Sequence, residues 1–289
     1  MAIAAATLDV PDLAAIRQAA ARIGPHVHRT PVMTCAAIDA ESARRGVVTH
    51  SSGNHGAALA YAAQRRGIPA WVVMPDNAPA VKQANVRRFG ATVRLCAPTV
   101  AAREAACDAV ARETGATLVH PFDDPRVIAG QGTAALELVE AVDDLDAVIA
   151  PCGGGGLLSG TAIAVTSWRL GIDVLGAEPA NADDAARGFA SGTLAPLAAT
   201  TTIADGLRTT LSARTLAALR KHVRAFGTCS EEAIVRAMRM TFERMKQVVE
   251  PSSAVPLACL LERTLDVAGR RVGIIVSGGN VDLDRLPWP

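Results

Sequence analysis

The sequence alternates short β-rich segments with alanine-rich helical segments, and no other feature constrains the fold as strongly. The β-rich segments of the first half are GVVTHSS, AWVVMP, TVRLC and TLVHP, and the helical segments between them end at Gly67, Gly90 and Gly115. A second series follows with DAVIAPC, DVLGAEP and RRVGIIVSGGN, and several helices are expected from Ser212 to Ala268. Strands that alternate with helices form parallel sheets covered on both faces. We therefore predict an α/β fold with parallel sheets flanked by helices.

The two series of segments predict two domains. We assign residues 1–45 and 124–289 to a larger domain and residues 46–123 to a smaller one. Ligands of open parallel sheets bind outside the carboxyl ends of the strands, and often between domains. The cleft between the two domains is therefore the expected ligand site.

The composition excludes several classes of partner. The chain has 289 residues, with 29 basic and 28 acidic side chains, and its formal net charge is +1. This balance gives no electrostatic reason to expect nucleic acid or an anionic membrane surface. No segment reaches the roughly 18 apolar residues of a membrane span, and the N-terminus does not resemble a signal peptide. The six cysteines are scattered, as in reduced proteins, so we expect a cytoplasmic protein with a small ligand.

Four consecutive glycines, Gly153, Gly154, Gly155 and Gly156, join an apolar strand to a helix in the segment VIAPCGGGGLLSG. Glycines at such a junction let backbone N–H groups converge on an anion, and the helix N-terminus adds partial positive charge. The segment matches neither a Walker loop nor a dinucleotide fingerprint. We predict a phosphate site here, with a flexible turn as the alternative.

The segment SGGN, from Ser277 to Asn280, ends the last predicted strand. A hydroxyl group followed by two glycines at this position would let a ligand ring approach the backbone. An ordinary turn explains the segment equally well when it is considered alone.

The segment THSSGNHG places several small polar residues at the start of a helix that is expected to begin near Asn54. Helix N-capping explains one serine or asparagine, but it does not explain the whole set. Gly53 allows close approach of the backbone, Asn54 offers donors and an acceptor, and the Ser52 hydroxyl can exchange a proton if it is desolvated. His55 is expected to form structural hydrogen bonds rather than to act as a base.

The segment GAEPANADDA places Glu178, Asp183 and Asp184 beside a strand end. Carboxylates together with a backbone carbonyl suit Mg²⁺ or Ca²⁺. A solvated helix start, with acidic residues at its positive end, is the competing interpretation.

Eight motifs together resemble one protein family. In order they are HRTPV, THSSGNHG, HPFDDPRVIAGQGT, PCGGGGLLSG, GAEPANADD, TIADGL, ERMKQVVEPSSAV and VSGGNVDLD. They resemble the serine/threonine dehydratase and serine racemase group of fold-type-II pyridoxal-phosphate enzymes, from about Arg29 to the C-terminus. The resemblance implies a two-domain architecture similar to tryptophan synthase β, with pyridoxal phosphate bound to the larger domain.

The resemblance also implies a reaction and partners. The first expectation is an ammonia-lyase that converts serine, threonine or another β-hydroxy amino acid into a 2-oxo acid and ammonia. An amino-acid racemase of the same family, or a non-catalytic protein that binds pyridoxal phosphate or another phosphate compound, is the alternative. A homodimer is implied as well.

The resemblance assigns roles to the residues named above. Gly153–Gly156 would hold the cofactor phosphate, Ser277 the pyridine nitrogen, and Asn54 the ring hydroxyl. The substrate carboxylate would be received at the start of the helix, by Ser51, Ser52, Gly53 and His55. Ser52 matches the serine that is the acid/base of the racemases. Glu178, the carbonyl of Ala182, and Asp184 match the divalent-cation ligands of the family.

One family element is absent. Relatives carry a strand and the motifs K-x-E-N-x-Q and S-F-K-x-R-G-A upstream of RGVVTHSS, and the lysine of the second motif forms the Schiff base with the cofactor. In this chain Glu41 runs directly into Ser42, and that segment is missing. The three lysines, Lys82, Lys221 and Lys246, lie in other predicted helices, so none is expected to replace it, and arginine does not form the imine.

The missing segment has three explanations at this stage. Residues are absent from the sequence as read, the polypeptide carries a deletion, or the chain is a non-catalytic relative. In each case the sequence as written predicts a cofactor cradle without its covalent anchor.

Overall fold

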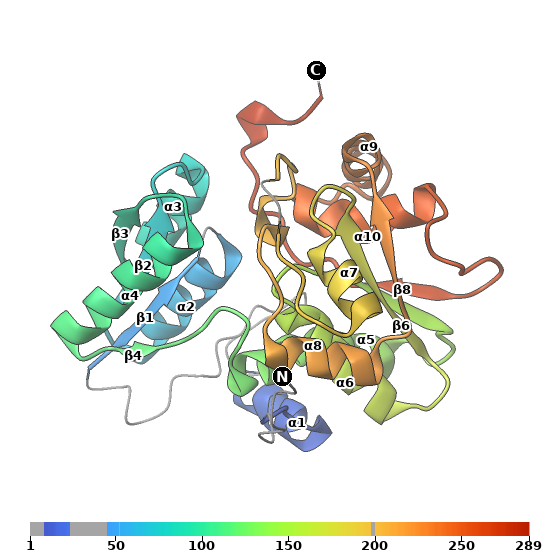
Figure 1. Ribbon diagram of the computed structural model, residues 1–289, viewed down its shortest axis with the longest axis horizontal. Helices are drawn as coiled ribbons and strands as arrows, with labels where there is room; N and C mark the ends of the chain where they lie inside the picture. Colours follow the sequence, from blue (N-terminus) through green and yellow to red (C-terminus); the bar gives the residue numbers. More distant parts are fainter. Residues whose placement is uncertain (1–8, 24–44, 52, 198–199, 289) are drawn as a thin grey trace.

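The protein forms two separate parallel sheets, each covered by helices (Figure 1). The structure is a computed structural model that describes residues 9–23, 45–51, 53–197 and 200–288. Every strand pairing in both sheets is parallel. The predicted α/β class is therefore confirmed. The predicted boundaries at residues 45/46 and 123/124 stay a prediction, although the two sheets fall on either side of the second one.

The smaller sheet has the strand order β3-β2-β1-β4. Its strands are β1 (Val47–His50), β2 (Ala70–Pro75), β3 (Thr92–Cys96) and β4 (Thr117–Leu118). Its helices are α2 (Asn54–Arg66), α3 (Ala80–Arg88) and α4 (Val100–Thr114). Val47 packs with residues of α2 and α3, whereas its neighbour Val48 packs with residues of α4. Successive residues of a strand point to opposite faces, so α4 covers the face opposite α2 and α3.

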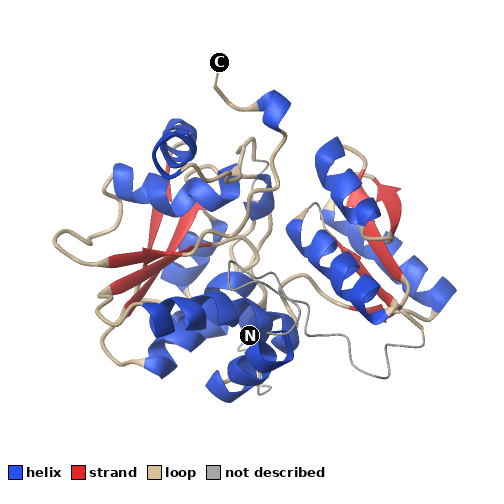
Figure 2. Cartoon of the chain, turned by 180° about the vertical axis from the view of Figure 1, so that it is seen from behind, coloured by secondary structure: helices blue, strands red, loops and turns tan. Residues whose placement is uncertain are grey.

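The larger sheet has the strand order β7-β6-β5-β8. Its strands are β5 (Ala147–Pro151), β6 (Asp173–Pro179), β7 (Ala225–Cys229) and β8 (Val272–Ile274). One core cluster joins it to α1 (Leu13–Ile23), α5 (Pro125–Ala141), α6 (Gly156–Trp168), α7 (Asp184–Ser191) and α8 (Ala213–His222). A second cluster joins it to α9 (Glu231–Met240) and α10 (Pro251–Leu261). Figure 2 shows these two helical layers on either side of the sheet from behind.

Strand β7 was not predicted from the sequence, which suggested only helices from Ser212 to Ala268. Its sequence, AFGTC, is short and contains a glycine, so it lacks the β-rich composition of the other strands. It forms because it pairs in register with β6, from Leu175 with Ala225 to Pro179 with Cys229. Tertiary pairing, rather than local propensity, therefore completes the edge of the larger sheet.

The glycine run is held in place by a close crossing of α5 and α6. A Cβ atom at Gly160 of α6 would lie 2.3 Å from the carbonyl oxygen of Ile128, and one at Gly132 of α5 would lie 2.8 Å from the carbonyl oxygen of Gly160. The two helix backbones touch at this point, and only glycine fits there. Because α6 begins at Gly156, the crossing fixes the position of the predicted phosphate site.

The described residues also form short helical turns. They are η2 (Asp205–Leu207), η3 (Thr241–Met245) and η4 (Leu283–Arg285). Among the described residues, no helix is both long enough and apolar enough to span a bilayer.

Replacing Leu158 of α6 by alanine should destabilise the larger unit. The Leu158 side chain is fully buried in the cluster between α6 and the sheet. Leu158→Ala should lower the free energy of unfolding in urea by about 2–5 kcal/mol, because it removes buried methyl groups and leaves a cavity. The matched control is Leu170→Ala, whose side chain is 93% exposed and which should change stability by less than about 0.5 kcal/mol. Equal effects of the two substitutions would contradict this description of the core.

Candidate functional site

A cavity of about 260 Å³ lies between the two sheets, where strands of both end. His50 is the last residue of β1 and Ser51 follows it, Gly153 follows β5, and Ser277 follows β8. Parallel strands direct their carboxyl ends to one edge of a sheet, and here the edges of the two sheets meet at the same cavity. The cavity brings together the predicted residues Ser51, Gly53, Asn54, His55, Gly153, Gly154, Gly155, Gly156 and Ser277. Ser52 lies outside the described residues.

The four glycines form a tight turn against the rest of the cavity wall. Gly155 has a φ of +85°, which side chains rarely adopt, and α6 begins at the next residue. A Cβ atom at Gly154 would lie 2.3 Å from the ring of Phe122, and one at Gly153 would lie 3.0 Å from the Cα atom of Leu207. The loop is therefore a backbone surface at a helix N-terminus, which is the arrangement that binds an anion. A merely flexible turn would not require this packing.

The first turn of α2 does not use its polar side chains as caps. The N-cap position is Gly53, which has no side chain, and α2 begins at Asn54 as predicted. Ser51 Oγ accepts a hydrogen bond from the Gly53 N–H (3.1 Å). The Asn54 amide donates to Glu250 Oε1. The asparagine is thus oriented by a buried carboxylate from the larger unit rather than by its own helix.

Three histidines, His50, His55 of α2 and His120, line the cavity, and each has a lowered pKa. Burial, and to a lesser extent the neighbouring His120, lowers the pKa of His50 to about 4. Burial also lowers the pKa of His55 to about 4, and that of His120. His120 Nδ1 accepts the N–H of Asp123 (2.9 Å), which leaves Nε2 to carry the proton. His55 Nε2 is buried and has no hydrogen-bond partner in the described chain.

Ser277 is positioned by a residue that sequence reasoning missed. Ser253 Oγ, in the first turn of α10, accepts hydrogen bonds from the backbone N–H groups of Ser277 (2.6 Å) and Gly278 (3.1 Å). The Ser277 hydroxyl, which is in the cavity wall, lies 3.5 Å from the same Oγ. The motif EPSSAV and the motif SGGN therefore act as one unit, although each looks like a separate turn in the sequence.

Lys82 of α3 also lines the cavity, and sequence reasoning did not place it there. Its ammonium group contacts both oxygens of Asp205 (2.7 and 2.8 Å) and Glu250 Oε2 (3.3 Å). The lysine is only 5% exposed, and burial raises the pKa of Glu250. This cluster, Lys82–Asp205–Glu250, links the smaller unit to the larger one at the cavity. The one signal in the sequence is that lysine is rare in this chain.

Arg103 of α4 is a second cation in the wall that the sequence did not single out. Its Nε atom is buried and has no hydrogen-bond partner among the described residues. Glu104, the next residue, lines the cavity too and is exposed. The Lys82 ammonium group is paired with two carboxylates. The Arg103 Nε–H has no such pair within the described ranges and is available to an acceptor group of a ligand.

The predicted cation ligands lie away from this cavity, between the end of β6 and the start of α7. Glu178 and Asp184 are at most 1% exposed, whereas Asp183 is half-buried and pairs with Arg187 (2.8 Å). Of the three acidic residues, only Asp183 fits the competing interpretation, in which they are solvated at a helix start. Ala182 is buried beside them.

The two buried carboxylates differ in their partners. Glu178 accepts the N–H groups of Ala185 (3.2 Å) and Ala186 (2.7 Å), whereas neither oxygen of Asp184 has a partner in the described chain. Burial raises the pKa of Glu178 to about 9 and that of Asp184 to about 6. Among the described residues, no group of three His, Cys, Asp or Glu side chains is arranged to hold a metal. The cation site, which would include a backbone carbonyl, stays a prediction.

The glycine loop, Asn54 and Ser277 line one cavity, and residues 26–278 match the family described as pyridoxal-phosphate dependent enzyme. The chain belongs to this family. Its fold is that of the fold-type-II pyridoxal-phosphate enzymes, as the resemblance implied.

Named relatives of the family are similar over most of the chain. The β-hydroxyaspartate dehydratase of Paracoccus denitrificans (strain Pd 1222) is 50% identical over 251 residues, which are 87% of this chain and 80% of that protein. The serine racemase of Oryza sativa subsp. indica is 43% identical and covers 95% of this chain and 92% of its own. The structure of maize serine racemase superposes with a TM-score of 0.90 at 42% identity, with 95% of each chain covered. The structure of a threonine deaminase from T.th. has a TM-score of 0.84 at 41% identity, with 94% of this chain and 99% of that chain covered.

The alignment with the Oryza sativa serine racemase also shows that this chain is shorter than that relative within the aligned region. It runs over 313 positions, which exceeds the 289 residues of this chain, so the racemase has residues without a counterpart here. The predicted gap, between Glu41 and Ser42, lies outside the described residues.

Replacing Asp184 by asparagine should stabilise the cation-free pyridoxal-phosphate enzyme increasingly as the pH rises. Burial raises the pKa of this carboxyl from 3.8 to about 6, so between these values the folded state binds more protons than the unfolded state. The free energy of unfolding of the wild type then falls with rising pH over that interval. In melts in EDTA from pH 4 to pH 8, the Tm advantage of Asp184→Asn over wild type should grow by roughly 2–4 °C. Most of this growth should occur as the pH rises to about 6, and the advantage should persist at higher pH.

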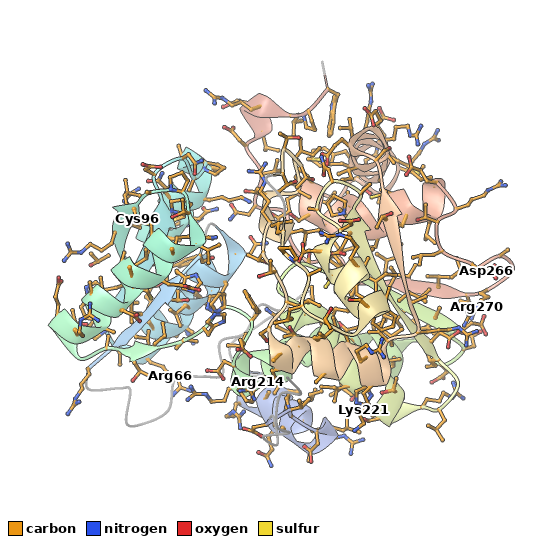
Figure 3. All side chains as sticks on the ribbon, viewed as in Figure 1. Arg66, Cys96, Arg214, Lys221, Asp266 and Arg270 are labelled. Carbon is orange, nitrogen blue, oxygen red and sulfur yellow. The ribbon has the colours of Figure 1, made fainter. Side chains whose placement is uncertain are left out.

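The matched control is Asp266→Asn, because Asp266 is exposed (Figure 3). Its Tm difference from wild type should stay constant with pH. A constant difference for Asp184→Asn as well would show that its carboxylate is not buried in solution.

Proposed function

We propose that this protein is a pyridoxal-phosphate enzyme that removes the α-proton of a small β-hydroxy amino acid, with racemisation as the leading reaction. The observation that carries the proposal is that the glycine loop, Asn54 and Ser277, from three distant parts of the chain, line one cavity. The similarity to serine racemases over 95% of the chain supports racemisation ahead of the ammonia-lyase reaction that the sequence first suggested.

The described residues fit the cofactor. A phosphate fits against the backbone of Gly153–Gly156, where Cβ atoms would collide with neighbours, and the N-terminus of α6 adds favourable charge. The Ser277 hydroxyl can donate to the pyridine nitrogen. The Asn54 amide, oriented by Glu250, can hydrogen-bond the ring hydroxyl. When bound, the cofactor supplies an electron sink for the negative charge that develops at the α-carbon of the substrate.

The start of α2 can bind the carboxylate of the substrate through uncharged groups. Ser51 and the adjacent backbone offer hydrogen bonds to a carboxylate, and the neutral histidines close that side of the cavity. Proton transfer at the α-carbon needs an acid/base group on at least one face of the substrate. Ser52 is the predicted group for one face, and that role stays a prediction.

Elimination of water from a β-hydroxy amino acid is the second candidate, and two observations favour it. A relative that is 50% identical is named β-hydroxyaspartate dehydratase. In addition, Arg103 brings to the cavity a buried Nε–H that has no partner in the described part of the chain, which favours a substrate with a second carboxylate. A substrate with a second carboxylate could pair with this guanidinium, whereas serine and threonine offer no charge to it.

The proposal extends to a cation and an assembly. Mg²⁺ or Ca²⁺ would bind Glu178, the Ala182 carbonyl and Asp184, because two buried acceptor oxygens of Asp184 lack a partner in the described chain. We also propose a homodimer with a small amino-acid substrate, which the family resemblance supports. A rise in Tm on adding Mg²⁺ or Ca²⁺ to wild type, but not to Asp184→Asn, would support the cation site. Analytical ultracentrifugation would measure the oligomeric state.

The first test follows the α-proton of the substrate in D₂O, because both candidate reactions remove it. Protein loaded with pyridoxal phosphate should remove the α-proton signal of L-serine in NMR spectra, and chiral chromatography should then detect D-serine. Ammonia and a 2-oxo acid would indicate elimination instead. Gly154→Ala should lower the exchange rate by roughly 100-fold, because its Cβ atom would meet the Phe122 ring 2.3 Å away and displace the loop. Cofactor retained on the wild type, with neither exchange of the α-proton nor formation of a 2-oxo acid from any β-hydroxy amino acid, would overturn the proposal.

The second test concerns substrate choice. If Arg103 binds a second carboxylate, Arg103→Met should lower kcat/KM for 3-hydroxyaspartate by roughly 10–100-fold, through the loss of a charge-assisted hydrogen bond, and should change kcat/KM for serine little. Arg112→Met is the matched control, since Arg112 is exposed on the same helix. Equal losses of kcat/KM for both substrates would show that Arg103 does not discriminate between them.

A further inference from the structure

We propose that Lys82 supplies the primary amine that binds the aldehyde carbon of pyridoxal phosphate covalently in this chain. The inference rests on the proposed function, because it assumes that pyridoxal phosphate occupies the cavity. It assigns to an α3 residue the covalent role that the missing family segment leaves open.

The count of amines singles out this residue. The chain has three lysines, and the structure describes all of them. Lys221 is exposed on α8 (Figure 3), and Lys246 is exposed after η3, where its Nζ donates to the Glu243 carbonyl (2.7 Å). Only Lys82 lines the cavity. No other lysine amine of this chain is therefore placed to reach a ligand between the sheets.

The position of the Lys82 amine agrees with the chemistry of the cofactor. Its side chain crosses Gly53, where a Cβ atom would lie 3.1 Å from Lys82 Cδ and 3.4 Å from Nζ. Its Nζ contacts one oxygen of Glu250, and the other oxygen of that carboxylate accepts from the Asn54 amide. In pyridoxal phosphate the aldehyde is on the ring carbon next to the one that bears the hydroxyl. An amine beside the hydroxyl-binding asparagine is thus beside the aldehyde.

The neighbouring carboxylates can take the proton that the amine must lose. Nζ is held by Asp205 and Glu250, which are within 3.3 Å of it. Burial raises the pKa of Glu250, so this carboxyl accepts a proton more readily than an exposed one. The neutral amine then attacks the aldehyde carbon to form a C–N bond. The carbonyl oxygen, after taking up protons, leaves as water while the C=N bond forms, so no oxidant or reductant is needed.

A purely electrostatic role for Lys82 makes a different prediction. If the lysine only neutralises Asp205 and Glu250, arginine should replace it, because the guanidinium keeps the charge and the hydrogen bonds. If its amine forms the covalent bond, arginine cannot replace it, because the guanidinium does not form the imine. Lys82→Arg therefore separates the two roles, and Lys221→Arg is the matched control at an exposed site.

The experiment uses the full-length protein after its intact mass has been matched to the 289-residue sequence. The protein is loaded with pyridoxal phosphate, reduced with borohydride, digested and mapped by mass spectrometry. We expect the pyridoxyl group on the peptide that contains Lys82, and at least a tenfold lower total label in Lys82→Arg but not in Lys221→Arg. Circular dichroism and Tm verify that the variants fold. The wild-type peptide map decides the point even if Lys82→Arg does not fold.

The remaining outcomes separate two failures. Label on Lys221, Lys246 or the N-terminal amine, with none on Lys82, overturns the inference. Cofactor that survives dialysis with no reducible label also overturns it, while leaving the cofactor cradle of the proposed function intact. If dialysis removes all of the cofactor from the wild type, both the inference and the proposed function fail.

Discussion

The parallel direction of every strand pair is the constraint on which the rest of this structure depends. A parallel sheet presents all its carboxyl ends at one edge, and the two sheets meet edge to edge at the cavity. Residues that are more than 200 positions apart in the chain, such as Ser51 and Ser277, line the same space for this reason. The helices between the strands make the parallel arrangement possible and bury both faces of each sheet.

Buried polar contacts give this common edge its chemistry. Lys82 from the smaller unit meets Asp205 and Glu250 from the larger one, and Glu250 in turn orients Asn54. Removing one member of such a cluster leaves another buried charge without a partner, which is why these side chains are expected to be interdependent. The same contacts hold together the two halves of the proposed cofactor site, so binding and the packing between the units are coupled at one place.

Much of the fold and part of the site could be predicted from residue order. The alternating segments predicted the strands β1, β2, β3, β4, β5, β6 and β8 in their observed places, and the glycine run predicted the start of α6. Strand β7 could not be predicted, because AFGTC has no strand pattern of its own and forms only on the edge of β6. Ser253, Arg103 and Lys82 were missed for a similar reason. A serine, an arginine or a lysine on a helix has no distinctive neighbours in the sequence, and its role depends on what the fold places opposite it.

The sequence by itself determined the α/β class and the family, and it predicted the groups that we propose hold a phosphate and a ring, because these depend on local patterns such as GGGG, THSSGNHG and SGGN. It also showed that the chain has only three lysines. The tertiary structure alone decided that Lys82 faces the cavity while Lys221 and Lys246 face the solvent, and that Glu178 and Asp184 are buried rather than solvated. Burial and long-range contact are properties of packing between distant segments, and no local pattern encodes them.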